Sequence, residues 1–230
     1  MEITERLENI NFFNGKENLS IMHISDVHLW YSVKILSKLK MLIATNNPDL
    51  IVLTGDYYDL PKGAHHFREF LIEQAKSHKI VFIKGNHDII YGKRISGLLS
   101  GIPNCIDVEN LVYTFKSKNG YLYHITSWKN KEQLPIHHNE KNIVLIHNPE
   151  KIKVNQLSKI DLILAGHLHG GQFIFFKTKN NSNFPGCILY KYCTDRRQIM
   201  NTILIVSKGL GDTFPFRFNC PKEIVNIAIA

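Results

Sequence analysis

The chain has 230 residues, of which 44% are hydrophobic and 21% charged, and its formal net charge is +8. These values are ordinary for a globular protein with a sizeable core, and we expect one domain over residues 1–230. No stretch approaches the roughly 18 consecutive apolar residues of a membrane span, and the N-terminus lacks the apolar core of a signal peptide, so we expect a cytoplasmic protein.

The positive charge favours an anionic partner: a phosphate ester, a nucleic acid or an anionic lipid. A nucleic-acid platform gathers its basic residues on one face and interleaves aromatic ones, a pattern that this chain lacks. Nucleic acid is therefore not favoured, and a generally solvated basic surface is the simpler interpretation. The most clustered basic residues are Lys177, Lys179, Lys191, Arg196 and Arg197.

The four cysteines contain no C-x-x-C pair. Reduced thiols are the simpler expectation, and a disulfide between Cys187 and Cys193 is the alternative.

Strands and helices alternate along the first part of the chain. Apolar runs predict buried strands over 19–25, 49–54 and 79–84. Apolar residues at helical spacing predict a helix over 33–43, capped by Ser32 and ended by Asn46–Asn47–Pro48, and a second helix around 67–75.

The second part of the chain changes to antiparallel strands. Asn119–Gly120 lies between apolar runs at 111–115 and 121–126, which is a hairpin signal. Further strands are predicted over 142–146, 163–165, 172–176, 202–207 and 224–229, and Pro149 is expected to open a helix to about residue 158. Residues 177–200 are predicted to form a long polar excursion of the kind that serves as a lid.

Five of the predicted buried strands end in polar residues. These are Asp26 and His28; Asp56 and Asp59; Asn86, His87 and Asp88; His147; and His167 with His169. Residues that follow strands in this way can converge at one edge of a sheet, where α/β proteins hold ligands. Turn chemistry explains one such cluster easily, but not five in succession.

Carboxylates and imidazoles together bind Mn, Fe or Zn, and the absence of nearby cysteines argues against a structural zinc site. The set offers too many oxygen and nitrogen ligands for one tetrahedral ion. It suits two ions that share a carboxylate, about 3.5–4 Å apart, with a hydroxide between them as the nucleophile. Asn86 would contribute a neutral amide oxygen.

The motifs Asp26-x-His28, Gly55-Asp56-x-x-Asp59, Gly85-Asn86-His87-Asp88, His147 and Gly166-His167-x-His169 resemble the signature of the calcineurin-like metallophosphoesterases. The resemblance extends from about residue 20 to the C-terminus. It implies an α/β fold in which two mixed β-sheets pack face to face as a sandwich, with flanking helices outside.

The resemblance also implies a role for each position. Asp26, His28 and His169 would hold the first metal. Asn86, His147 and His167 would hold the second, and Asp56 would bridge both. His87 would act on the phosphoryl transition state or protonate the leaving oxygen, and Asp59 would orient His87. For Asp88 a local structural role is equally consistent.

Three further runs, at 169–172, 207–211 and 217–224, resemble a bacterial branch that contains membrane-associated phosphodiesterases, some of which act on UDP-diacylglucosamine-type lipid precursors. Many members carry an N-terminal membrane helix. The sequence predicts none over residues 1–230, so we expect at most peripheral membrane contact.

We therefore expect a metal-dependent hydrolase, with Mn favoured over Fe or Zn, that cleaves a phosphodiester or pyrophosphate bond with His87 as acid. Its substrate would be a phosphate ester of a small molecule or of a lipid-linked group. A phosphomonoesterase and a non-catalytic metal-binding scaffold are the alternatives. Among the other histidines, His65 and His66 are the best candidates for a substrate-side group.

Overall fold

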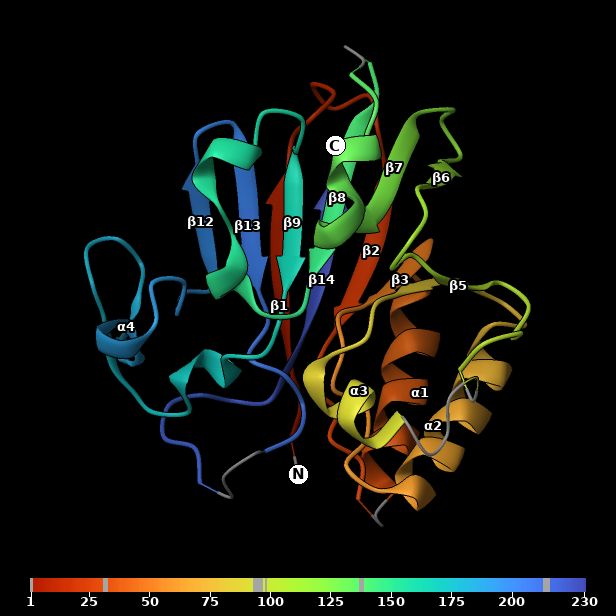
Figure 1. Cartoon of the computed structure of the whole chain (residues 1–230), viewed down its shortest axis with the longest axis vertical. Coiled ribbons are helices and arrows are strands. Elements are labelled where there is room, and N and C mark those ends of the chain that lie inside the picture. The colour runs from red at the N-terminus through yellow and green to blue at the C-terminus, as the bar shows by residue number, and fades with distance from the viewer. Residues whose placement is uncertain (1, 31–32, 93–96, 98, 137–138, 213–215) are drawn as a thin grey trace.

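The computed structural model describes every residue except 1, 31–32, 93–96, 98, 137–138 and 213–215 (Figure 1). Ser32, the expected cap of the first helix, lies outside the described residues.

Two six-stranded sheets form the body of the described chain. The first has the order β1 (Thr4–Ile10), β14 (Glu223–Ile229), β2 (Leu19–Ile24), β3 (Leu50–Leu53), β4 (Lys79–Phe82) and β5 (Cys105–Asp107). Strands β2 to β5 are parallel, while β14 runs antiparallel to β2 and parallel to β1. The carboxyl ends of β2, β3 and β4 therefore meet at one edge.

The second sheet has the order β12 (Arg196–Ile199), β13 (Thr202–Val206), β9 (Leu162–Ala165), β8 (Lys141–Ile146), β7 (Leu122–Ser127) and β6 (Tyr113–Lys116). Its four central strands are parallel, and β12 and β6 pair antiparallel at the two edges. The predicted change to antiparallel strands is therefore correct only at the two edges, because the connections between the central strands are long enough to cross over the sheet. Both sheets are mixed, which confirms the predicted fold class, and β6–β7 is the predicted hairpin.

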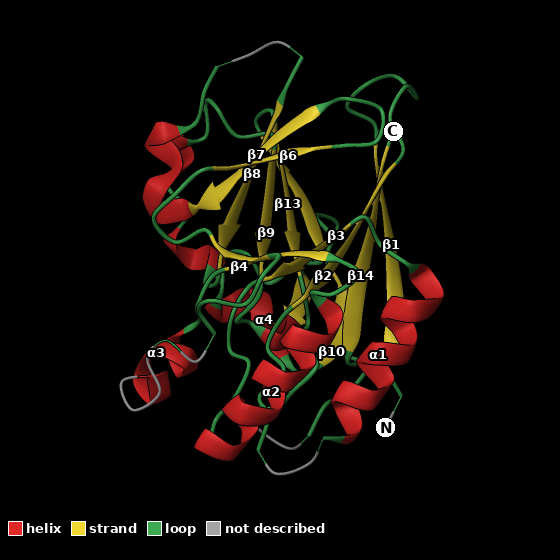
Figure 2. Ribbon diagram, turned by 90° about the vertical axis from the view of Figure 1, so that its right-hand side faces the viewer, coloured by secondary structure: helices red, strands yellow, loops and turns green. Residues whose placement is uncertain are grey.

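The two sheets pack face to face because their strands are apolar on both sides (Figure 2). In β3, Leu50 and Val52 point between the sheets, whereas Ile51 and Leu53 point to the outer face. This period of two is that of a β-strand whose two faces are both buried.

Helices cover the outer face of the first sheet. They are α1 (Lys34–Asn46), which ends at a left-handed Asn47 as predicted, and α2 (Pro61–Gln74). Their apolar side chains, such as Leu39 and Phe67, form one cluster with the outward side chains of β2 and β3. A further short helix, α3 (Asn86–Gly92), begins directly after β4.

The outer face of the second sheet is covered by short turns, so the predicted helix over 149–158 is wrong. Instead, two 3-10 turns occupy Pro149–Lys151 and Val154–Gln156, separated by an extended Ile152. Ile152, Leu157 and Ile160 are buried against this sheet. Ile152 and Leu157, five residues apart, would lie about 140° apart around an α-helix, so the two short turns and the extended backbone between them direct both side chains to the sheet better than one helix would.

The excursion over 177–200 is structured. Strand β10 (Ile174–Lys177) pairs with β11 (Asn183–Pro185), the short helix α4 (Gly186–Leu189) follows, and the segment ends in β12 of the second sheet. All four cysteines are free, as expected. Across the described ranges, no helix has the length and apolar character needed to cross a bilayer.

Candidate metal centre

The polar clusters of both sheets meet at one end of the sandwich. The loops after β2 and β3 are tied together because the His28 amide donates to the Asp56 carbonyl at 3.0 Å. The loop after β9 joins them because the His167 amide donates to both carboxylate oxygens of Asp26, at 3.1 and 3.0 Å. A carboxylate from the first sheet thus fixes the histidine loop of the second.

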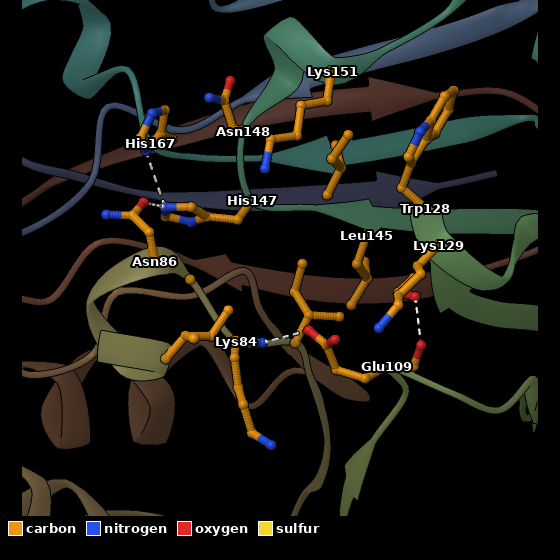
Figure 3. Close-up of a pocket in the computed structure, with 15 residues that line it drawn as sticks. Lys84, Asn86, Glu109, Trp128, Lys129, Leu145, His147, Asn148, Lys151 and His167 are labelled. Carbon is orange, nitrogen blue, oxygen red and sulfur yellow. Dashed lines mark hydrogen bonds between the residues drawn. The ribbon is translucent and has the colours of Figure 1, made fainter. Parts of the chain in front are cut away.

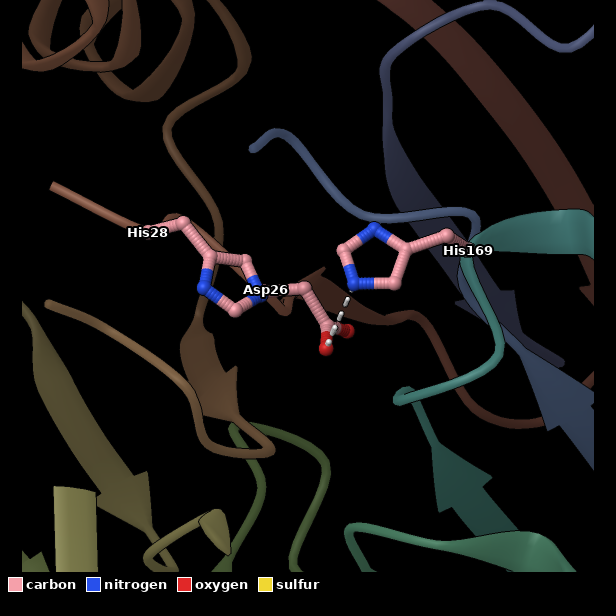
Figure 4. Close-up of side chains that lie close together, drawn as sticks. All are labelled: Asp26, His28 and His169. Carbon is pink, nitrogen blue, oxygen red and sulfur yellow. Dashed lines mark ion pairs between the residues drawn. The ribbon is translucent and has the colours of Figure 1, made fainter. Parts of the chain in front are cut away.

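Asp26, His28 and His169 form one group of potential ligands (Figure 4). All three are buried, and the Asp26 carboxylate lies between the two imidazoles, 3.7 Å from Nε2 of His169. Burial alone would raise the pKa of Asp26, but the neighbouring histidines and the Ser25 hydroxyl lower it to about 2. Burial lowers the pKa of His169 to about 4, so this ring is neutral at pH 7.

Asp56, His147 and His167 form a second group. Asn86 adds its amide oxygen beside His147 and His167 (Figure 3). Nε2 of His147 lies 3.1 Å from Oδ2 of Asp56, 3.0 Å from Oδ1 of Asn86 and 3.1 Å from Nδ1 of His167. Four nitrogen and oxygen atoms from both sheets therefore surround one small space.

Asp56 lies between the two groups. Its Oδ2 atom is 3.1 Å from Nε2 of His147 and 3.8 Å from Nε2 of His28. Its other oxygen accepts a hydrogen bond from the His87 amide at 2.9 Å. The carboxylate is thus oriented by the backbone and reaches both groups with one oxygen.

The hydrogen-bond pattern indicates that these atoms suit a cation. Nδ1 of His147 donates to the Thr54 carbonyl at 2.8 Å, so in the neutral ring Nε2 presents a lone pair. That lone pair faces the oxygens of Asp56 and Asn86, which also carry lone pairs. Burial opposes protonation, yet Asp56 and Asp26 raise the pKa of His147 to about 9, so a positive charge is favoured here.

His28 gives the same indication in the first group. Its Nδ1 atom donates to Oδ1 of Asp59 at 2.9 Å, which in the neutral ring leaves a lone pair on Nε2. Nε2 is buried and finds no hydrogen-bond partner within the described part of the chain. A buried lone pair without a donor is costly unless a metal ion satisfies it, so the residues present fit divalent cations.

Asp59 joins this cluster to His87. Its Oδ1 atom accepts from Nδ1 of both His28 and His87, the latter at 2.5 Å, and its Oδ2 atom accepts from Nε1 of Trp30. The hydrogen bond to Asp59 is the main reason why the pKa of His87 is raised, against the opposing effect of burial. His87 is therefore held in one orientation with a preference for its protonated form.

Asp88 has a structural position. Its carboxylate accepts hydrogen bonds from the amides of Asp56, Tyr57 and Gly85, at 2.6, 2.9 and 2.8 Å. Burial raises its pKa to about 6. Asp88 thus clamps the loop after β3 to the loop after β4.

The backbone of the site is strained. Asp26, His28, Asp56, His167 and His169 all have positive φ, between 46° and 72°. This left-handed region costs a non-glycine residue about 1 kcal/mol or more, and such residues concentrate at functional sites. The loops are also closely packed: a methyl group at Gly166 would overlap the Ser25 hydroxyl and the Asp26 carboxylate.

Two residues that contact the site, Arg217 and Trp30, were not predicted as site residues from the sequence. Arg217 donates from Nη2 to Nδ1 of His169 at 3.2 Å, and Trp30 contacts Asp59. Arg217 opens the run 217–224 noted in the sequence, but that run does not assign it to the ligand groups, and no local signal marks Trp30, since each contact depends on the fold. His65 and His66 lie on α2, and neither belongs to the described lining of the cavities beside the ligand groups.

Three cavities adjoin the ligand groups: a central one directly over them and one on each side. The central one, of about 380 Å³, is lined by Asn86, His87, His167 and His169 and by Leu189 and Tyr190 of the excursion. A cavity of about 510 Å³ adjoins Asn86, His147 and His167, and another of about 360 Å³ adjoins His28 and Trp30. Space thus exists on both sides of the ligand groups.

Comparison with known proteins identifies bacterial relatives along most of the chain. An uncharacterized metallophosphoesterase of Campylobacter jejuni is 28% identical over 92% of this chain and 59% of its own length. The phosphodiesterase YaeI of Escherichia coli is 24% identical over 95% of this chain and 84% of its own. The chain thus spans less than two thirds of the Campylobacter relative.

Solved structures show the same fold at low identity. TT1561 of Thermus thermophilus superposes with a TM-score of 0.53 at 12% identity, covering 85% of this chain and 90% of that one. GAP50 of Plasmodium superposes with a TM-score of 0.51 at 13% identity, covering 85% and 72%. The family model of the calcineurin-like phosphoesterases matches residues 19–171. This chain therefore belongs to the calcineurin-like phosphoesterase family.

Proposed function

We propose that this protein is a metal-dependent phosphodiesterase that uses two divalent ions, with manganese as the favoured metal. Asp26, His28 and His169 would hold one ion, and Asn86, His147 and His167 the other. Asp56 would be shared. The observation that carries this proposal is the set of buried lone pairs on His28 and His147 that face further acceptors instead of donors.

The bound ions would supply Lewis acidity to the phosphoryl oxygens and lower the pKa of an attacking water. Proton transfer to the leaving oxygen would be the task of the protein's own side chains. His87 lines the central cavity and is positioned to give a proton to the leaving oxygen, with Asp59 fixing its ring. Its raised pKa supports this role, because the acid must stay protonated near neutral pH.

Space on both sides of the ligand groups supports a diester over a monoester. A phosphodiester carries two substituents, and the cavities beside His147 and beside His28 offer one place for each. The name of the E. coli relative, a phosphodiesterase, points in the same direction.

The excursion supports a substrate with an apolar, lipid-linked portion. Leu189 lines the central cavity and is 79% exposed, and the adjacent Ile188 is 68% exposed. Helix α4 therefore presents large apolar side chains beside the site, and these suit a lipid chain or a membrane surface better than nucleic acid.

The test is hydrolysis of bis(p-nitrophenyl) phosphate and p-nitrophenyl phosphate by protein that is stripped with a chelator and reloaded with manganese. We expect activity only after reloading, with the diester preferred. Preference for the monoester would replace the proposal by a phosphatase. Two bound equivalents of metal without hydrolysis of either ester would favour a scaffold.

A further inference from the structure

The 510 Å³ cavity beside the second ligand group has features that the hydrolysis of a phosphate ester does not by itself require. Asn86, His147 and His167 form one end of it (Figure 3). Its other walls include the apolar side chains of Ile83 and Leu145. A group that enters this cavity is thus a direct neighbour of a phosphate at the ligand atoms.

The cavity is basic. Three lysines, Lys84, Lys129 and Lys151, and one acid, Glu109, belong to its lining. Lys84 is engaged elsewhere, because its ammonium group pairs with Asp107 at 3.3 Å. Figure 3 shows the Lys84 side chain running away from His147, whereas the Lys151 side chain extends toward it.

Lys129 and Lys151 are the cations available to a ligand. Both are exposed, and no ion pair joins either ammonium group to a carboxylate among the residues the structure describes. The nearby Glu150 carboxylate is occupied, since it accepts the amides of Lys191 and Tyr192. Glu109 accepts the Lys84 amide at 3.1 Å and is the one acid of the lining.

We propose that this cavity binds a second phosphate of the substrate, held by Lys129 and Lys151. This rests on the proposed function and narrows it: the preferred substrates would be phosphodiesters that carry another phosphate close to the scissile one. Two exposed ammonium groups suit a phosphate dianion better than a neutral sugar or base, because charge-assisted hydrogen bonds are the stronger ones.

Two thymidine ligands that differ by one phosphate test the proposal. Titration calorimetry of manganese-loaded protein would compare thymidine 3′,5′-bisphosphate with thymidine 5′-monophosphate. We expect the bisphosphate to bind about ten-fold more tightly, the combined factor for two exposed charges. The Lys129→Met/Lys151→Met variant should lose this preference.

Two single variants serve as controls. Lys153→Met removes an equally exposed charge two residues from Lys151 and outside the cavity, and it should keep the preference. Glu109→Gln retains an acceptor for the Lys84 amide but removes the negative charge, so the preference should rise. Equal binding of both ligands by the wild-type protein, or equal effects of Lys153→Met and the double variant, would overturn the proposal.

Hydrolysis separates this proposal from the function on which it rests. Thymidine 5′-(p-nitrophenyl phosphate) would be compared with its 3′-phosphorylated form, which shares the leaving group. If the lysines control binding of the bisphosphate but neither ester is cleaved, the subsite stands and the phosphodiesterase proposal fails. If both esters are cleaved with a ratio that the double variant leaves unchanged, the subsite is wrong.

Discussion

Replacing His87 by alanine should separate acid catalysis from metal binding. The side chain hydrogen-bonds to Asp59 at 2.5 Å, is 26% exposed and lines the central cavity, so its removal widens that open cavity instead of leaving an enclosed hole. Asp59 keeps its partners His28 and Trp30. We therefore expect two equivalents of metal still to bind, and the free energy of unfolding to fall by no more than about 2 kcal/mol.

The loss of activity should depend on the leaving group. General acid catalysis contributes about 10²–10⁴-fold, or roughly 3–5 kcal/mol, when the leaving oxygen needs a proton. We expect a loss of that size for a dialkyl phosphodiester, followed by chromatography, and a much smaller one for bis(p-nitrophenyl) phosphate. Metal content would be measured by mass spectrometry on the same samples, with His65→Ala, an exposed histidine on α2, as the matched control.

If His87→Ala lost the same factor of activity on both esters, the acid role would be refuted. p-Nitrophenolate leaves as a stable anion and needs no proton, so loss of the acid should hardly slow its departure. If the His87→Ala variant bound less metal than the wild-type protein, the acid role would also be refuted, because His87 would then be a metal ligand. The companion variant Asp59→Asn removes the main cause of the raised pKa of His87. The acid then loses its proton at lower pH, so the alkaline limb of the pH–rate profile should move to lower pH.

Two predictions concern the scaffold around the site. Gly166→Ala places a methyl group against Ser25 and Asp26, so we expect a stability loss of about 1–3 kcal/mol and a weakened first metal site. Metal content at the wild-type level together with an unchanged melting midpoint would contradict this. Asp195 is the second case: burial would raise its pKa, but Lys208 and Lys177 lower it to about 2. A carboxyl group whose pKa is lower in the folded protein than in the unfolded chain stabilises the fold at pH values above its unfolded pKa. This stabilisation is lost as the pH falls to the folded pKa, so the free energy of unfolding should decrease by about 2 kcal/mol between about pH 4 and pH 2. The free energy of unfolding, measured with urea, should depend less steeply on pH in Asp195→Asn than in the wild-type protein. The same pH dependence in both proteins would exclude Asp195 as its source.

Local patterns were sufficient for the strands that carry the site. Strands β3, β8 and β9 are buried on both faces, so each contains a short apolar run, and a polar residue follows within two positions of its end. Because β2 and β3 are parallel, Asp26 and Asp56 at their carboxyl ends share one edge of the first sheet, and because β8 and β9 are parallel, His147 and His167 share one edge of the second. The packing of the two sheets then brings the two edges together.

Local patterns were insufficient where a neighbour in space provides the stabilisation. Strand β1 buries Glu8 and exposes 65% of Leu7, so its sequence has no apolar alternation to detect. It forms because it pairs with β14, from the other end of the chain, and Arg6 donates to the Val206 carbonyl and pairs with Glu223. The segment after Pro149 is likewise extended because the second sheet buries Ile152.

The sequence therefore identified the candidate ligand residues, whereas the tertiary structure determined which atom of each side chain is available for binding. The motifs name the histidines and carboxylates, but a motif does not say which imidazole nitrogen carries the proton. The Thr54 carbonyl decides this for His147, and Asp59 decides it for His28. Likewise, Lys129 and Lys151 lie 22 residues apart in unremarkable polar stretches, and only the packing of the strands around them makes them walls of one cavity. Hydrogen bonds and charges act over a few ångströms in space, whereas sequence patterns report only on neighbours along the chain.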